Sequence, residues 1–216
     1  MKILSDTIAS WHLRQKFRKY FRENTFGSLE SKSGEGSGLF QTRIIRRELP
    51  KLLRNLHVKT IIDSPCGDLN WIKKIDFNNM KYIGIDIVSE IIALNKRNHT
   101  NQEKEFYCLD IINDKLPKAD LILCRDCLVH LNFQQGIRAI RNFKKSGSKY
   151  LFITTFTNRP ANDELIGNEV WRPLNLQLFP FNFPKPIKLI NEKCTEGNNQ
   201  FADKCLGLWL LNDLSL

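Results

Sequence analysis

The sequence predicts an α/β fold in which a seven-stranded, mostly parallel sheet follows an N-terminal helical extension. Short runs rich in β-branched residues recur from residue 58 onward, and stretches with helical spacing lie between them. These runs are apolar throughout, which indicates strands buried on both faces, as in parallel sheets with right-handed crossovers. Residues 1–57 differ, because helical spacing and a glycine-rich loop dominate there.

The N-terminal extension, residues 1–56, is predicted to contain two helices joined by a loop. Apolar side chains recur at helical spacing over residues 5–23, and residues 24–38 hold four of the eleven glycines. A second helix is expected over residues 39–56, with Pro50 bending or dividing it.

Most of the net charge of +10 also lies in this extension, because residues 1–57 contain 12 Lys and Arg against 5 Asp and Glu. Such a segment suits nucleic acid, an acidic lipid surface or an anionic substrate, or it is simply a solvated helix face.

The second predicted domain, residues 57–216, holds the strands. They are expected within residues 58–63, 80–86, 105–111, 119–126, 149–156, 186–194 and 204–213, with helices over 88–98 and 132–145. The last two strands suit an antiparallel hairpin on the sheet. Because an open α/β sheet binds ligands beyond the carboxyl ends of its strands, the residues that end the strands are the candidate functional residues.

Composition excludes several other classes of protein. A chain with 42% hydrophobic and 26% charged residues is of ordinary globular composition, and no apolar run reaches the roughly 18–20 residues that cross a bilayer. With no signal-peptide pattern either, we expect a soluble, cytoplasmic protein. Cys124 and Cys127 form a CxxC pair that lies in an apolar run and has no second CxxC or CxxxH pair to complete a zinc site. We therefore expect them to be core cysteines and not zinc ligands.

Acidic residues end the first three predicted strands. Asp63 begins the segment Asp63-Ser-Pro-Cys-Gly-Asp68, Asp86 follows 23 residues later, and Asp110 ends the third strand. A carboxylate at Asp86 can accept both hydroxyls of a ribose, although it could also cap the following helix. Gly67 has no glycine two residues before it or three after it, so the dinucleotide fingerprint GxGxxG is absent.

Segments along most of the chain resemble one family of enzymes. The segment around Gly67 is similar to the first motif of class I S-adenosyl-L-methionine (SAM) methyltransferases, D/E-x-G-x-G-x-G, with Pro65 and Leu69 at two glycine positions. The strings GSLESKSGEGSG and QTRIIRRELPKLL resemble the signature ES-x-SG-x-GS then T-x-x-IR-x-x-LP of a small methyltransferase family from bacterial and giant-virus glycan clusters, which includes a chlorovirus rhamnose O-methyltransferase domain. PCGDLNW, YIGIDIV, DLILCRDCLVHL, TTF, WRPLNL with PFNFPKP, and DKCLGLWLL follow in the same order, so the resemblance spans roughly residues 26–213.

The resemblance implies a Rossmann-like class I methyltransferase fold that uses SAM and releases S-adenosyl-L-homocysteine (SAH). The loop at residues 30–38 is expected to cover the cofactor, and Asp110 with Ile111 to meet the adenine. Arg46 is expected to clamp the cofactor carboxylate, or else to lie on a solvated helix. The expected cofactor-binding residues are Asp63, Pro65, Cys66, Gly67, Trp71, Asp86, Ile87, Asp110, Ile111, Arg125 and Arg46.

A hydroxyl acceptor needs a general base, and Asp126 and His130 are the candidates. At i and i+4 they share one face if this segment is helical, and an imidazole accepts a proton near neutral pH. Asp126 could orient the imidazole, act as the base or hold a divalent metal, for which too few ligands are visible. Alternatively, Asp126 caps a helix and His130 packs beneath it.

The expected acceptor is a sugar hydroxyl in a glycan or glycan precursor. Trp171, Arg172 and Asn175, in the connection 157–185, are the expected acceptor contacts. One alternative is an RNA methyltransferase that uses the basic extension, although CRDC stands where base-methylating enzymes have an Asn/Asp-Pro-Pro-aromatic tetrad. A non-catalytic SAM-binding partner module is the other alternative.

Overall fold

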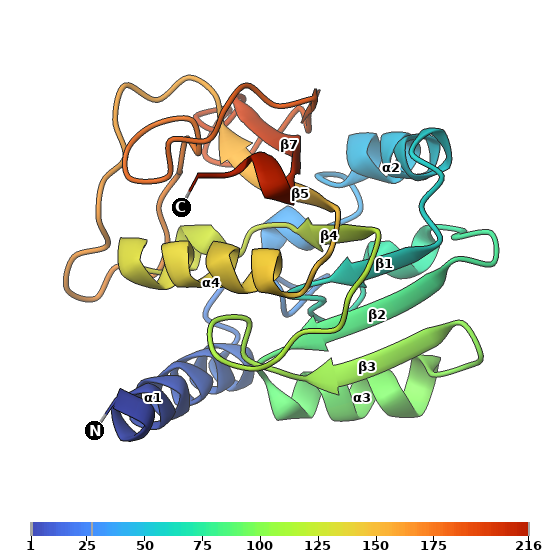
Figure 1. Ribbon diagram of the computed structural model, residues 1–216, viewed down its shortest axis with the longest axis horizontal. Coiled ribbons are helices and arrows are strands. Elements are labelled where there is room, and N and C mark those ends of the chain that lie inside the picture. The colour runs from blue at the N-terminus through green and yellow to red at the C-terminus, as the bar shows by residue number, and fades with distance from the viewer. Residues whose placement is uncertain (1, 27, 216) are drawn as a thin grey trace.

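The computed structural model describes residues 2–26 and 28–215, and their side chains from residue 8 onward. Residue 27 of the predicted loop lies outside this part of the chain, as do residues 1 and 216 at the ends of the two predicted domains. Within the described residues, a seven-stranded sheet has the strand order β3-β2-β1-β4-β5-β7-β6 (Figure 1).

The strands are β1 Thr60–Asp63, β2 Lys81–Asp86, β3 Lys104–Cys108, β4 Leu121–Cys124, β5 Tyr150–Phe156, β6 Lys188–Asn191 and β7 Lys204–Leu210. The α-helices are α1 Lys2–Glu23, α2 Arg43–Asn55, α3 Ser89–His99 and α4 Phe133–Lys145, and the 3-10 helices are η1 Glu35–Ser37, η2 Ile72–Lys74, η3 Leu128–His130 and η4 Leu211–Asp213.

All seven predicted strands form, and the predicted fold class is confirmed. β1 to β5 are parallel to their neighbours among these five strands, whereas β7 pairs antiparallel with both β5 and β6, as expected for the terminal hairpin. β1 lies between β2 and β4, so the direction in which strands are added reverses at β1. The carboxyl ends of β1, β2 and β4 therefore meet at the position where open α/β sheets bind ligands.

Helices cover both faces of the sheet because each presents an apolar stripe to it. Ile140 and Phe143 of α4 pack on one face in a core cluster with Ile122 and Leu151. Leu49 of α2 and Ile92 of α3 belong to the cluster on the opposite face. The two layers fix the strand ends in place.

The N-terminal extension differs from its prediction in detail. α2 begins at Arg43 instead of residue 39, because residues 38–42 form a turn in which the Thr42 amide donates to the Gly38 carbonyl. The helix also continues through Pro50, so the expectation that Pro50 divides it is wrong. Buried Leu49 and Leu53 hold α2 against the sheet on both sides of the proline.

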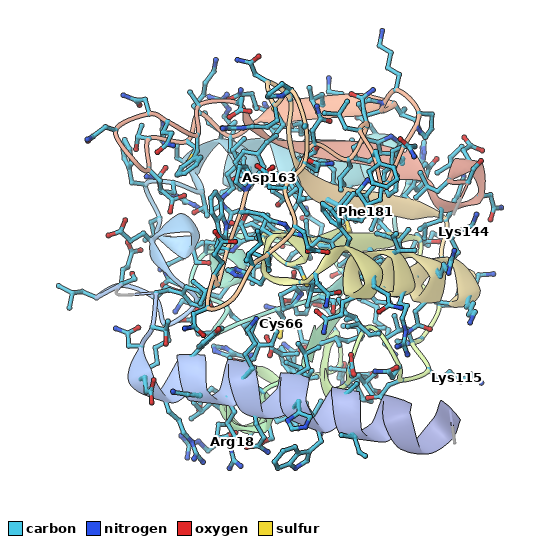
Figure 2. All side chains as sticks on the ribbon, turned by 90° about the vertical axis from the view of Figure 1, so that its left-hand side faces the viewer. Arg18, Cys66, Lys115, Lys144, Asp163 and Phe181 are labelled. Carbon is cyan, nitrogen blue, oxygen red and sulfur yellow. The ribbon has the colours of Figure 1, made fainter. Side chains whose placement is uncertain are left out.

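α1 lies across the end of the sheet to which the arrowheads of β1 to β4 point (Figure 1). Figure 2 looks onto this end and shows α1 along its lower side, with Cys66 above the helix. Polar contacts fasten α1 there: the Ser10 hydroxyl donates to Asp110 at 2.6 Å and Arg14 pairs with Asp114 at 2.8 Å. Among the described residues, no helix combines the length and the hydrophobicity that crossing a membrane requires.

Candidate active site

Two adjoining pockets open at the carboxyl ends of the strands. The pocket with the more extensive lining, which we call the large pocket, is formed by the ends of β1, β2 and β4, by residues 109–111 and by α1. The other, which we call the small pocket, is lined by residues 33–36, by residues that end or follow β4, β5 and β6, and by Lys204 at the start of β7. Phe26, Ser33, Asp126 and His130 line both pockets, so these residues mark the junction between them.

Asp86 is placed in the large pocket by the end of β2. Its carboxylate accepts hydrogen bonds from the Gly67 amide at 3.1 Å and the Val88 amide at 2.9 Å. Val88, not Asp86, is the N-cap of α3. An ionised carboxylate can accept about four hydrogen bonds, so Asp86 retains capacity for a ligand. Burial raises the pKa of Asp86 to about 6.

Asp63 and Asp110 also line the large pocket, but their carboxylates are bonded differently. Asp63 accepts a 2.6 Å hydrogen bond from the Tyr82 hydroxyl, and burial raises its pKa to about 7. Asp110 accepts from Ser10, from the Asn113 amide group at 2.7 Å and from the Ile112 backbone at 2.9 Å. The Asp110 carboxylate is thus bound into α1 and its own turn, while Ile111 contributes an apolar wall to the pocket.

The loop before η1 is fastened to the segment that follows β1. Asp68 accepts hydrogen bonds from the Ser31 hydroxyl and the Lys32 amide, both at 2.9 Å, and its own amide donates to the Ser33 hydroxyl at 3.2 Å. Gly67 has a φ of +54°, and a side chain there would collide with Ser33. Glycine is therefore required where this loop closes over the pocket edge.

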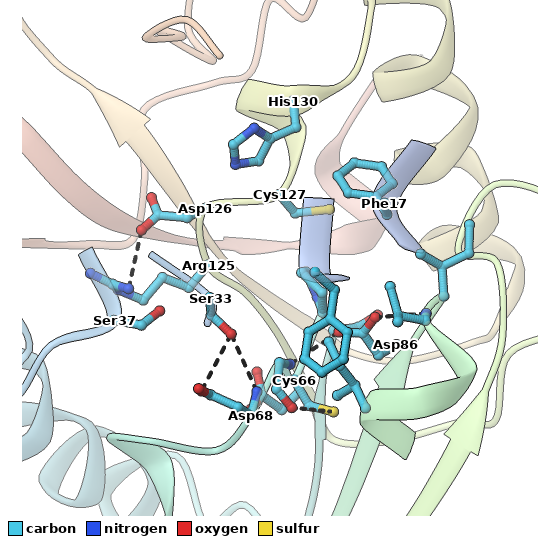
Figure 3. A pocket seen from close by; sticks show the side chains of 18 of the residues that line it. Phe17, Ser33, Ser37, Cys66, Asp68, Asp86, Arg125, Asp126, Cys127 and His130 are labelled. Carbon is cyan, nitrogen blue, oxygen red and sulfur yellow. Dashed lines mark hydrogen bonds and ion pairs between the residues drawn. The ribbon is translucent and has the colours of Figure 1, made fainter. Parts of the chain in front are cut away.

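His130 lies at the junction with a defined tautomer. Its Nδ1 is 2.6 Å from the Val170 carbonyl oxygen. Because a carbonyl only accepts, Nδ1 carries the proton and Nε2 of the neutral ring keeps a lone pair. Burial lowers the pKa of His130 below 6.5, so the neutral form dominates at pH 7. In Figure 3, His130 lies at the opposite end of the pocket from Cys66 and Asp68. The edge of its ring that is farthest from the backbone points into the pocket.

Asp126 occupies a different environment from the one predicted. Its φ of +52° excludes it from a helix, so the expected helix face shared by Asp126 and His130 is wrong. The carboxylate binds the Lys204 ammonium at 2.6 Å and the Arg125 guanidinium at 3.1 Å. Although burial opposes the shift, these two cations hold the pKa of Asp126 well below its usual range. Asp126 is therefore a weak base, and the Val170 carbonyl orients the imidazole in its place.

Most of the predicted cofactor-binding residues meet at the large pocket. Its lining includes Asp63, Pro65, Cys66, Gly67, Trp71, Asp86, Ile87, Asp110, Ile111 and Arg125. Arg125 is buried, binds Glu192 at 2.6 Å and lies over the Trp71 ring. Arg46 is the exception, since it lines neither pocket and donates to the Leu39 carbonyl at 2.8 Å. Its place on the loop-facing side of α2 directs it to that carbonyl.

Of the predicted acceptor contacts, Trp171 lines the small pocket, whereas Arg172 and Asn175 line neither pocket. Arg172 is buried, and its guanidinium donates to the carbonyls of Leu128 and Val129 at 3.0 Å. The Asn175 side chain accepts from the Gln177 amide at 3.0 Å. Both side chains bind backbone groups that irregular segments leave unpaired, and the structure places neither of them on a pocket with Trp171.

The sequence reasoning missed several residues of the small pocket. They are Glu35, Phe156, Glu196, Phe201 and Lys204. Glu196 and Phe201 lie in the polar connection 195–203, which has no periodic pattern. Lys204 offered a signal, because a lysine that opens a buried strand requires an anionic partner.

Comparison with known proteins assigns the chain to a family. A sequence model for methyltransferase domains matches residues 39–189. The chain belongs to the methyltransferase-domain family. This confirms the predicted enzyme class, a SAM-dependent methyltransferase, and with it the predicted cofactor. A search of curated protein sequences gave no match.

Solved methyltransferases share the fold at low sequence identity. 1,6-Didemethyltoxoflavin-N1-methyltransferase from Burkholderia thailandensis has a TM-score of 0.60 and 12% identity, over 95% of this chain and 89% of that one. The N-methyltransferase NodS from Bradyrhizobium japonicum, in complex with SAH, has a TM-score of 0.52 and 17% identity, over 76% and 86%. The chain spans only 34% of human N-acetylserotonin methyltransferase, at a TM-score of 0.45, 15% identity and 53% coverage of this chain.

Proposed function

We propose that this enzyme is a SAM-dependent O-methyltransferase that methylates a hydroxyl of a sugar in a glycan or glycan precursor. The observation that carries the proposal is the neutral His130, whose Nε2 lone pair lies where the large and small pockets meet. The resemblance of residues 26–213 to the small family that includes a chlorovirus rhamnose O-methyltransferase domain supports a sugar acceptor.

The residues of the large pocket fit the parts of SAM. Asp86 retains acceptor capacity for ribose hydroxyls, and Ile87 and Ile111 offer apolar surface for an adenine. The backbone at Gly67 and the Trp71 ring border the end nearer Arg125. The Asp86 carboxylate, which is mostly ionised at pH 7, also gives the pocket negative charge that suits a cation. When bound, SAM supplies a methyl group on a positively charged sulfur that leaves readily.

His130 performs the proton transfer in this proposal. A sugar hydroxyl is a poor nucleophile while it keeps its proton, and Nε2 accepts that proton as the oxygen acquires the methyl group. The Val170 carbonyl, which already accepts the Nδ1 hydrogen at 2.6 Å, stabilises the imidazolium that forms. The Asp126 carboxylate adds negative charge that favours the same cation. In-line positioning of the two reactants supplies much of the remaining acceleration.

The small pocket offers the surfaces that a sugar ring uses. Phe156, Trp171 and Phe201 form an aromatic wall, in which the Trp171 and Phe201 ring centroids are 4.8 Å apart. Sugar rings present C–H groups that pack on such apolar rings, and their hydroxyls bind polar groups. Charged groups of Asp126, Glu196 and Lys204 lie on the same pocket.

The basic extension gives little support to the RNA alternative. Arg18 and Arg22 of α1 bind Glu90 at 2.5 and 2.8 Å, and Arg14 binds Asp114. These three cations are engaged by two of the enzyme's own carboxylates, which leaves less positive charge to bind phosphates.

The test is methyl transfer from labelled SAM to a panel of neutral oligosaccharides, amines and RNA. We expect label in a saccharide as an alkali-stable ether, formed roughly 10²–10⁴ times more slowly by the His130→Gln variant at equal enzyme concentration. Label only in RNA or only in amines would overturn the proposal, and the amine arm matters because two of the structural neighbours described above are N-methyltransferases.

A further inference from the structure

The small pocket combines its aromatic wall with an unequal set of charges. Of the described residues that line it, Glu35, Asp126 and Glu196 carry negative charge and Lys204 carries positive charge. His130 is neutral at pH 7 for the reasons given above. Behind this lining, the positive charge of Arg125 is balanced by the Glu192 carboxylate, which accepts hydrogen bonds from the Arg125 Nε and Nη2. The lining is therefore net negative, which opposes the entry of an anion.

Lys204 and Glu196 form an ion pair at 3.7 Å that one hydroxyl oxygen can contact from the side. The Lys204 side chain is only 5% exposed, and one of its three N–H groups donates to Asp126 at 2.6 Å. Glu196 Oε2 lies 3.7 Å from the ammonium, beyond hydrogen-bond distance, and accepts from the Cys194 thiol at 3.3 Å. An ammonium donor and a carboxylate acceptor with this separation match a hydroxyl, which both accepts and donates. A phosphate or carboxylate only accepts, and an ammonium only donates.

Gly36 keeps the space beside these groups open. A Cβ at position 36 would lie 3.2 Å from Glu196 Oε2, 3.3 Å from Asp126 Oδ2 and 3.4 Å from Lys204 Nζ. A side chain at position 36 would therefore crowd all three charged atoms, and glycine keeps the approach to them open. Because His130 lines the same pocket, one ligand can place a hydroxyl at these charged groups and another at His130.

We propose that Glu196, Lys204 and Gly36 form a subsite that selects an uncharged acceptor ring with a second free hydroxyl, and that rejects rings bearing a phosphate or carboxylate. This inference rests on the proposed function, because it takes the small pocket as the acceptor site. It makes Glu196 and Lys204 specificity-determining residues, distinct from the base at His130.

The experiment compares neutral oligosaccharides with their uronic acid and phosphorylated counterparts. Methyl transfer is measured as kcat/KM, and saccharide binding to the SAH-loaded enzyme is measured by calorimetry. The wild type should favour the neutral ring by about 100-fold, and Glu196→Gln should reduce this preference about tenfold by improving the anionic acceptor. Gly36→Ala should weaken binding of the neutral saccharide by about tenfold or more, because the methyl group fills the subsite. Both variants should keep the wild-type SAH affinity.

Glu103→Gln is the matched control, since Glu103 is an exposed carboxylate that lines neither pocket. Equal use of neutral and anionic rings by the wild type, stronger binding of an amino sugar, or an unchanged preference in Glu196→Gln would each overturn the subsite while leaving the proposed function intact. Failure to methylate or bind any saccharide, with SAH still bound, would instead overturn the proposed function and the subsite together.

Discussion

The large and small pockets are built from different kinds of structure. The carboxylates of the large pocket follow strands of the regular sheet, and Asp86 is held there by the backbone amides of residues 67 and 88. Most groups of the small pocket come from irregular segments, and its charged groups depend on ion pairs between distant residues, such as Lys204 at the start of β7 with Asp126. The comparison indicates that the pocket proposed for the cofactor is encoded locally at strand ends, whereas the pocket proposed for the acceptor depends on the tertiary arrangement.

The largest expected effect is at the junction of the pockets. His130→Ala should slow turnover by roughly 10²–10⁴ and leave SAH affinity nearly unchanged, because the variant loses the base and keeps the large pocket. Steady-state kinetics and SAH calorimetry measure the two quantities, and His12→Ala, at an exposed histidine of α1, is the control. A rate close to that of the wild type would show that the base lies elsewhere.

A loss of the opposite kind is expected in the large pocket. Asp86→Asn should weaken SAH binding by roughly 10- to 100-fold, because an amide cannot replace the charged acceptor that binds a ribose. Calorimetry with SAH gives the affinity, and thermal unfolding of the variant checks that it remains folded. Wild-type affinity in a folded Asp86→Asn variant would exclude Asp86 from cofactor binding.

The strand ends were predictable because a parallel sheet places the carboxyl ends of its strands at one edge. This rule put Asp63 and Asp86 at the large pocket from the sequence alone. Prediction failed just beyond β4. The i, i+4 spacing of Asp126 and His130 suggested a helix, although the chain turns at Asp126 with a positive φ. The sequence did contain the correct signal, since Asn132 and Gln135 form the capping box that begins α4.

The acceptor side was harder to predict because its contacts join residues far apart in the sequence. Arg172 looked like a ligand contact next to a tryptophan, but buried carbonyls bind its guanidinium. Glu196 lies in a polar connection with no periodicity, and its proximity to Lys204 and Gly36 depends on how three segments fold together. Contacts of this kind produce no local sequence pattern from which they could be predicted.

The pockets should also differ in their response to pH. Because burial raises the pKa of Asp86 to about 6, SAH affinity should fall as the pH drops below 6 and the carboxylate protonates. The loss should approach about tenfold per pH unit where protonation is nearly complete, and Asp86→Asn should reduce it. Turnover at saturating substrates should also increase with increasing pH, with a midpoint below 6.5 that is set by His130. An Asp86→Asn variant whose SAH affinity keeps the full pH dependence of the wild type would contradict the assignment of the affinity profile to Asp86.

The smallest expected effect concerns the helix that covers the large pocket. Glu90→Gln removes the charge that binds Arg18 and Arg22, so α1 should dissociate more readily from the pocket edge. Exposed ion pairs contribute up to about 1 kcal/mol each, which predicts a two- to fivefold loss of SAH affinity. The wild-type affinity should also weaken at high salt more than that of the variant. Equal salt dependence in the two proteins would argue against this role of α1.

The most direct test is a crystal structure of the enzyme with SAH and a neutral saccharide. We expect the ribose of SAH at Asp86, and the reacting hydroxyl within hydrogen-bond reach of His130 Nε2, roughly 2.6–3.2 Å. SAH bound outside the large pocket, or an acceptor hydroxyl that faces away from His130, would contradict the assignment of the two pockets.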